Sequence, residues 1–147
     1  MRIGMAQTGT VGKKRLRILV VEDSALRSQF LSDKFSEQAV QIVEEPLAAV
    51  ELLNHANYDV IFLDYDLTAV PSQALVEKGT GIYVAKRLSE TINKSTPVVV
   101  HSMNIRAAEY MVGILENAVM IPFNRLREEL ESENIERLIE RITKRNP

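Results

Sequence analysis

Short apolar runs rich in β-branched residues alternate five times along this chain with longer segments that repeat apolar residues at helical spacing. Parallel neighbouring strands need a crossover connection, usually a helix, so this alternation predicts a parallel sheet with helices on both faces. The sequence therefore predicts a single α/β domain with a doubly wound, five-stranded parallel sheet. The predicted strands are residues 16–21, 39–43, 59–63, 97–100 and 118–121.

The domain boundaries follow from the same pattern. Residues 1–14 contain Gly, Thr and Lys without periodicity, which predicts a disordered lead-in, and residues 15–147 form the predicted domain. A long segment rich in turn-forming residues, 65–81, follows the third strand and exceeds a simple connection. The five-residue step from Leu130 to Ile135 indicates a break in the last helical region.

Composition excludes several classes of protein. The chain has no cysteine, which excludes disulfides, thiolate metal sites and a cysteine nucleophile. It has no apolar run of membrane-spanning length and no signal-like start, so we expect a cytoplasmic protein without a membrane partner. A net charge of −2, with no Trp, argues against a nucleic-acid partner.

Carboxylates follow two of the predicted strands at the point where each strand ends. Glu22 and Asp23 follow the first strand, and Asp64 and Asp66 follow the third. Ligands of such sheets bind outside the carboxyl ends of the strands, so we expect these acids to share one edge. Like charges held close together repel unless a cation joins them, and oxygen ligands favour Mg²⁺. The sequence therefore predicts a Mg²⁺ site at this edge.

Three segments resemble the receiver domain of two-component response regulators: RILVVEDSALRSQFLSDKF, YDVIFLDYDL and PVVVHS. The resemblance covers roughly residues 16–144 and implies the flavodoxin-like receiver fold. It also implies roles for particular residues. These are Asp64 as phosphoacceptor, Ser102 as the switch hydroxyl, Glu22 and Asp23 as the acidic pair that binds Mg²⁺, and Asp66 as the donor of a backbone carbonyl to the metal.

The chain departs from receivers at two positions. Receivers carry a Lys at the end of the fifth strand, before a Pro, where this chain has Ile121. Ala118 stands where receivers carry the aromatic residue that moves with the switch. The missing ammonium would have contacted the phosphoryl group, and a charge-assisted contact is worth about 1.5–3 kcal/mol. Arg106 and Arg125 are the candidates for a replacement cation.

A second resemblance points to a different chemistry. The segments DYDL, GTGIYVAKRL and VHSMN are similar to receiver-like domains proposed to process cyclic nucleotide phosphates. That resemblance implies that Asp64 and Asp66 hold a metal, that His101 acts as an acid or base, and that Asn104 orients a phosphate. The residues alone leave a simpler alternative, in which His101 is a half-buried residue at a strand end and Asn104 caps a helix.

The expected function is a stand-alone receiver in a phosphorelay. The resemblance implies that Asp64 accepts a phosphoryl group from a histidine kinase or phosphotransfer protein with Mg²⁺ as cofactor, and that output passes to a separate effector protein or through a homodimer. In this interpretation the chain is a phosphoacceptor signalling domain, and the sequence leaves enzyme activity open. Two alternatives stay open: a pseudo-receiver that acts as an interaction module without phosphorylation, and a metal-dependent phosphoesterase acting on a cyclic nucleotide-like substrate.

Overall fold

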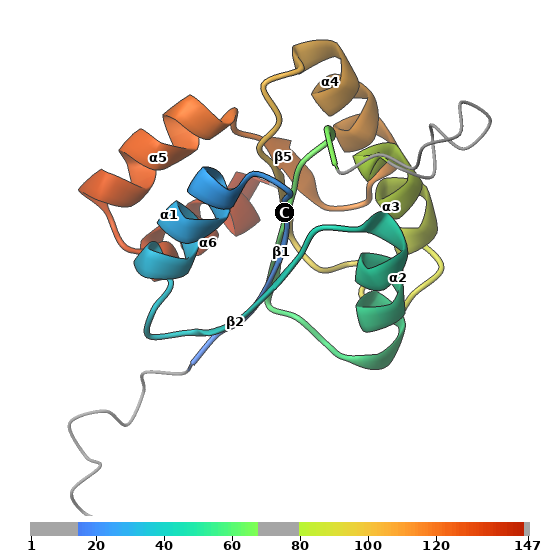
Figure 1. Cartoon of the computed structure of the whole chain (residues 1–147), viewed down its shortest axis with the longest axis horizontal. Coiled ribbons are helices and arrows are strands. Elements are labelled where there is room, and N and C mark those ends of the chain that lie inside the picture. Colours follow the sequence, from blue (N-terminus) through green and yellow to red (C-terminus); the bar gives the residue numbers. More distant parts are fainter. Residues whose placement is uncertain (1–14, 68–79, 146–147) are drawn as a thin grey trace, which may run out of the picture.

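The computed structural model describes residues 15–67 and 80–145. The described part contains five strands and six helices in alternating order (Figure 1). The strands are β1 (Arg17–Val21), β2 (Ala39–Val43), β3 (Val60–Leu63), β4 (Val98–Val100) and β5 (Ala118–Met120). The helices are α1 (Ala25–Lys34), α2 (Pro46–His55), α3 (Gly81–Leu88), α4 (Ile105–Ile114), α5 (Phe123–Ser132) and α6 (Ile135–Arg145).

The strands form one parallel sheet in the order β2-β1-β3-β4-β5. The chain moves outward from β1 to β2 and then returns to place β3 on the other side of β1, so the topological switch point lies between β1 and β3. This is the flavodoxin-like order, and it confirms the predicted doubly wound sheet. Crevices for ligands form at this switch point, outside the carboxyl ends of the strands.

Three of the described helices cover each face of the sheet, and this explains why the central strands are apolar on both sides. Figure 1 shows α2, α3 and α4 on one face and α1, α5 and α6 on the other. Neighbouring residues of one strand serve different faces: Val21 packs in the cluster beneath α2–α4, and Val20 packs in the cluster beneath α1, α5 and α6. A strand buried on both faces reads as a continuous apolar run rather than an alternating one.

The predicted break in the last helical region is confirmed. Helix α5 ends at Ser132 and α6 begins at Ile135, with the side chain of Asn134 accepting a hydrogen bond from the Arg137 N–H at 2.9 Å. The predicted lead-in and most of the long segment after β3 lie outside the described residues. Among the described residues, no helix combines the length and the apolar content that crossing a bilayer requires.

Candidate active site

Three polar residues follow the ends of three neighbouring strands. Glu22, Asp64 and His101 come directly after β1, β3 and β4, and all three are buried. The pairing of the sheet continues one step into this edge: the Asp64 N–H donates to the Val21 carbonyl at 3.1 Å, and the His101 N–H donates to the Leu63 carbonyl at 3.1 Å. The three residues thus occupy the same register position on three neighbouring strands, which fixes their backbones side by side at the switch point.

Glu22 is fully buried and uses both carboxylate oxygens. Arg27 donates from Nε to Oε1 at 3.1 Å and from Nη2 to Oε2 at 3.0 Å. The Nε2 atom of His101 lies 2.7 Å from Oε1, and the Ser24 N–H donates to Oε2 at 3.0 Å. Burial alone would raise the pKa of Glu22, but the hydrogen bonds from His101 and Arg27 outweigh it and lower that pKa to about 2. Glu22 is therefore ionised throughout the physiological range.

Asp64 occupies a less compensated position beside Glu22. Its side chain accepts the Tyr65 N–H at 2.8 Å, and its Oδ2 lies 3.5 Å from the Arg27 Nη2. Burial raises the pKa of Asp64 to about 6, with a further increase from the charge of Glu22 and only partial relief from His101, Tyr65 and Arg27. The raised pKa means that burial disfavours the ionised carboxylate by more than the nearby positive charges and the hydrogen bond compensate.

The start of α3 is held against the backbone of Asp64. The Gly81 N–H donates to the Tyr65 carbonyl at 2.9 Å, and Asp66 forms an isolated antiparallel bridge with Thr80. A Cβ atom at Gly81 would overlap the carbonyl oxygen of Asp64, so only glycine permits this approach. Gly81 therefore has a structural reason, since it lets α3 begin against the backbone of Asp64.

The remaining predicted site residues lie around this cluster. Asp23 is half-buried, and its charge adds to the raised pKa of Arg27, whose main cause is the hydrogen bond to Glu22. The Asp66 side chain is exposed. Ser102 is buried, and its Oγ accepts the Asn104 N–H at 3.0 Å. The metal-binding roles of Asp23 and Asp66 and the switch role of Ser102 stay predictions.

The other two residues of the His-Ser-x-Asn run have clear positions. Asn104 is the N-cap of α4, where its Oδ1 accepts the Ala107 N–H at 3.1 Å, as the simpler interpretation expects. The expectation that His101 is half-buried is wrong. Its side chain is fully enclosed beside Phe123, with the ring centroids 6.2 Å apart, because it lies under α5 at the inner edge of the sheet.

The cation beside Asp64 is not either of the two arginines that the sequence suggested. Arg125 pairs with Glu129 on its own helix at 2.9 Å, and Arg106 is exposed on α4. Ile121 is buried in the core beneath α1, α5 and α6, so it brings no charge to the strand-five position. Sequence reasoning missed Arg27. It lies in the first turn of α1, a helix that begins at the site edge, and this position was the available signal.

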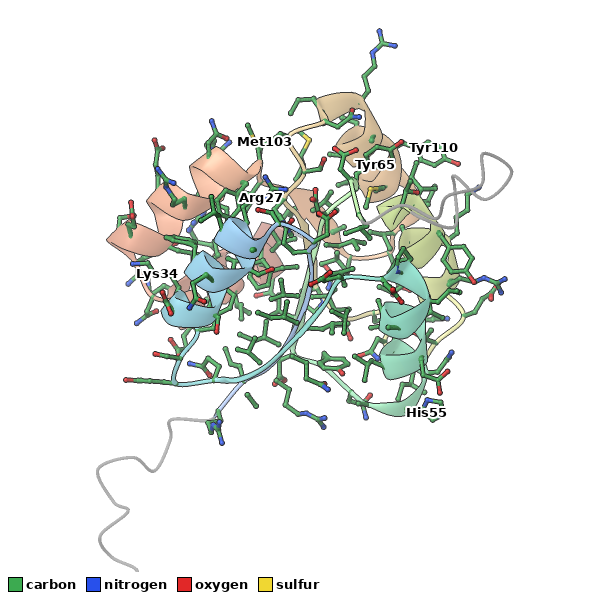
Figure 2. The ribbon with its side chains drawn as sticks, viewed as in Figure 1. Arg27, Lys34, His55, Tyr65, Met103 and Tyr110 are labelled. Atoms are coloured by element: carbon green, nitrogen blue, oxygen red, sulfur yellow. The ribbon has the colours of Figure 1, made fainter. Side chains whose placement is uncertain are left out.

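Figure 2 shows how the labelled side chains lie relative to this edge. Arg27, Tyr65 and Met103 gather where the strands end, whereas His55 lies at the opposite end of the molecule. The guanidinium of Arg27 also lies over the Phe123 ring, 5.8 Å from its centroid. This contact packs the Arg27 side chain against α5, and one third of that side chain is exposed.

The donor set suits a divalent cation. One potential ligand atom from each of Glu22, Asp64 and His101 lies within 4.8 Å of the others. Two buried carboxylates with a raised pKa on one of them have an unmet demand for positive charge, which a divalent ion supplies. Arg27, whose side chain is one third exposed, provides part of that charge in the structure.

Comparisons with known proteins agree with this architecture. A family model described as "Cyclic-phosphate processing Receiver domain" matches residues 17–117, more than half of the chain. A search of curated proteins by sequence gave no significant match.

Solved receiver structures are similar to this fold. One is the receiver domain of the sensor histidine kinase PA1611 from Pseudomonas aeruginosa PAO1, with a magnesium ion in its active-site cleft: TM-score 0.67, 18% identity, 87% of this chain and 97% of that chain covered. Another is a CheY-like receiver domain from Methylobacillus flagellatus, with TM-score 0.60, 17% identity and coverage of 81% and 98%. The Mn²⁺-bound response regulator Rcp1 gives TM-score 0.58, 21% identity and coverage of 86% and 88%. At such identities the likeness shows the fold alone.

Proposed function

Because the chain belongs to the cyclic-phosphate processing receiver domain family, we propose that its switch-point edge binds a divalent cation and a phosphoryl group, with Asp64 as the phosphoryl acceptor. The observation that carries this proposal is the state of Asp64, a buried carboxylate whose pKa of about 6 leaves it mostly ionised at pH 7. An ionised acid that is short of positive charge suits a cation and an electrophilic phosphorus.

In this reaction an Oδ atom of Asp64 attacks the phosphorus of a phosphohistidine or acyl phosphate. A new O–P bond forms while the P–N or P–O bond to the donor breaks, and the leaving group keeps the electron pair and takes a proton from solvent. Glu22 and Asp64, with Asp23 and the Asp66 carbonyl as further predicted ligands, would hold Mg²⁺. The bound cation would offset charge that builds up on the phosphoryl oxygens. The Mg²⁺ in the PA1611 receiver domain supports this assignment.

Arg27 takes the place of the strand-five Lys in this proposal. Its guanidinium already lies 3.5 Å from Oδ2 of Asp64, and one third of the side chain is exposed, so it can turn toward a phosphoryl group on that oxygen. A planar guanidinium binds two phosphoryl oxygens at once. Response-regulator receivers take this positive charge from a Lys at the end of the fifth strand, whereas here it would come from Arg27 on α1.

A phosphorelay role follows from this chemistry. The phosphoryl donor would be a histidine kinase or a phosphotransfer protein, and the acyl phosphate would be read by a separate effector protein or by a second copy of the chain. Both partners are inferred from the proposed receiver chemistry alone.

Intact-mass analysis tests the acceptor role. After incubation with acetyl phosphate and Mg²⁺, the wild-type chain should gain one phosphoryl group, and Asp64→Asn should gain none. Asp66→Asn is the matched control, because this exposed acid keeps its backbone carbonyl, and it should still form the adduct. An adduct on the folded Asp64→Asn variant, or none on the wild type, would contradict the proposal.

A second measurement tests Arg27. Arg27→Met should shorten the lifetime of the adduct roughly tenfold, since a charge-assisted contact is worth about 1.5–3 kcal/mol. Arg106→Met, which removes an exposed arginine from α4, should leave the lifetime unchanged. Equal lifetimes in both variants would remove Arg27 from the proposal.

One observation favours a second candidate function, the opening of a cyclic phosphate. His101 lies in the same buried cluster as Asp64, and the matching family is described as cyclic-phosphate processing. In this reaction water attacks the phosphorus and forms a new P–O bond, and the proton it loses goes to solvent. One ring P–O bond breaks, and His101 passes a proton to the departing alkoxide. Turnover of a cyclic nucleotide that is lost in His101→Asn, with no adduct at Asp64, would favour this candidate. A folded protein with neither activity would be a pseudo-receiver.

A further inference from the structure

The metal-binding residues predicted from the sequence are all oxygen donors, but the cluster that the structure assembles contains a nitrogen donor. Potential ligand atoms of Glu22, Asp64 and His101 lie within 4.8 Å of one another. Ligand atoms at roughly 2.1 Å from a divalent ion lie about 3 to 4.2 Å apart, so a small contraction would place all three around one ion. All three side chains are buried, which excludes solvent from this side of the cluster.

A set of two carboxylates and one imidazole changes the choice of ion. Mg²⁺ is a hard cation that prefers oxygen ligands and retains several of its waters, whereas imidazole nitrogen suits first-row transition ions such as Fe²⁺, Ni²⁺ and Zn²⁺, of which Mn²⁺ is the weakest-binding neighbour. We infer that His101 is the third ligand of this site and that the site binds a first-row transition ion in preference to Mg²⁺. The inference rests on the proposed function only in that both use Glu22 and Asp64.

The state of the His101 ring allows this role. Its Nδ1 atom is buried and has no hydrogen-bond partner among the residues that the structure describes. No contact on Nδ1 therefore fixes the tautomer, and Nε2 can either donate a proton to Glu22 or present its lone pair to an ion. With an ion on Nε2, the neutral ring would carry its one proton on Nδ1.

Arg27 and the ion would be alternative partners of Glu22. In the structure Arg27 occupies both oxygens of that carboxylate, at 3.1 Å and 3.0 Å. Because one third of the Arg27 side chain is exposed, it can leave the carboxylate when an ion arrives. The departing guanidinium then becomes available to a phosphoryl group on Asp64, so metal binding would set Arg27 free for its proposed role.

The sequence makes a direct test possible, since the whole chain has two histidines. Untagged His55→Asn protein, which replaces an exposed histidine at the end of α2, retains His101 as its one histidine. With ¹⁵N-histidine incorporated, pulsed electron paramagnetic resonance of bound Mn²⁺ should show nitrogen coupling whose isotope pattern changes with the label. Mn²⁺ bound without that coupling would overturn the inference, and this readout needs no variant at the site.

Isothermal titration with MnCl₂ and MgCl₂, without any phosphoryl donor, tests the preference. We expect Mn²⁺ to bind at least about tenfold more tightly than Mg²⁺, and His101→Asn to remove that advantage while Mg²⁺ binding persists. Arg27→Met should tighten the binding of both ions. Equal affinities for the two ions in the wild type would overturn the inference.

The outcomes separate this inference from the proposed function. An adduct on Asp64 together with Mn²⁺ binding that lacks nitrogen coupling would overturn the inference and leave the acceptor role standing. Nitrogen coupling without an adduct would support the inference and contradict the acceptor role. Failure of both ions to bind would overturn the inference and remove the cation from the proposed function.

Discussion

Among the described residues, two clusters place one arginine between two carboxylates, and the pKa values of their acids differ. In the edge cluster, made of Glu22, Asp64 and Arg27, two buried acids share one arginine. In the junction cluster, where α5 meets α6, Arg141 binds Glu129 at 2.7 Å and Glu133 at 2.6 Å, and Arg125 adds a second cation to Glu129.

The difference lies in how completely charge is compensated. Burial would raise the pKa of Glu129, but hydrogen bonds from its two arginines lower it. In the edge cluster Arg27 makes its two shorter hydrogen bonds to Glu22, and burial raises the pKa of Asp64 to about 6. A surface network with balanced charges fastens two helices, whereas a buried cluster with an excess of negative charge has capacity for a cation or an electrophile.

The largest expected effect breaks the edge cluster. Glu22→Gln should destabilise the fold by about 3 kcal/mol, because it leaves Arg27 and the buried His101 without their charged acceptor. Urea unfolding followed by circular dichroism measures the loss. The matched control is Glu129→Gln in the junction cluster, for which a change below about 1 kcal/mol is expected. Equal losses in the two variants would contradict the distinction between the clusters.

The next effect has the opposite sign. In the folded state the pKa of Asp64 rises from 3.8 to about 6, so its contribution to stability is fully present below pH 3.8 and is lost as pH rises through about 6. Two pKa units correspond to about 3 kcal/mol at most, a figure that already includes the Arg27 contact. Asp64→Asn should therefore stabilise the fold by about 2 kcal/mol at pH 7.

Thermal unfolding of the Asp64→Asn variant and the wild type across the pH range checks this linkage. The difference in midpoint temperature should shrink toward zero between pH 7 and pH 4. A difference that stays constant with pH, or that grows as pH falls, would show that the charge of Asp64 is already compensated in the folded state.

The smallest effect belongs to the junction cluster. Arg141→Met should cost less than about 1 kcal/mol, because the pairs are partly exposed and their attraction is screened by salt. Unfolding in low and high NaCl should show the cost shrinking as salt rises. If the loss exceeds that of Glu22→Gln, the junction rather than the edge holds the more valuable ion pairs.

Much of the fold could be predicted because burial and backbone period are local properties of a sequence. The second strand was predicted at residues 39–43, and β2 occupies those positions. The step from Leu130 to Ile135 likewise predicted the separation of α5 from α6. The approach of Gly81 to Asp64 could not be predicted, since the long segment between them carries no periodicity.

The sequence by itself determined the α/β alternation and the placing of acids at the strand ends, because both follow from the order of residues along single elements. Only the tertiary structure decided that His101 bonds to Glu22 and that Arg27, rather than Arg106 or Arg125, lies beside Asp64. These contacts join different elements, so they depend on strand order, register and the docking of α1. A few ångströms of such geometry set which acid has a lowered pKa and which a raised one.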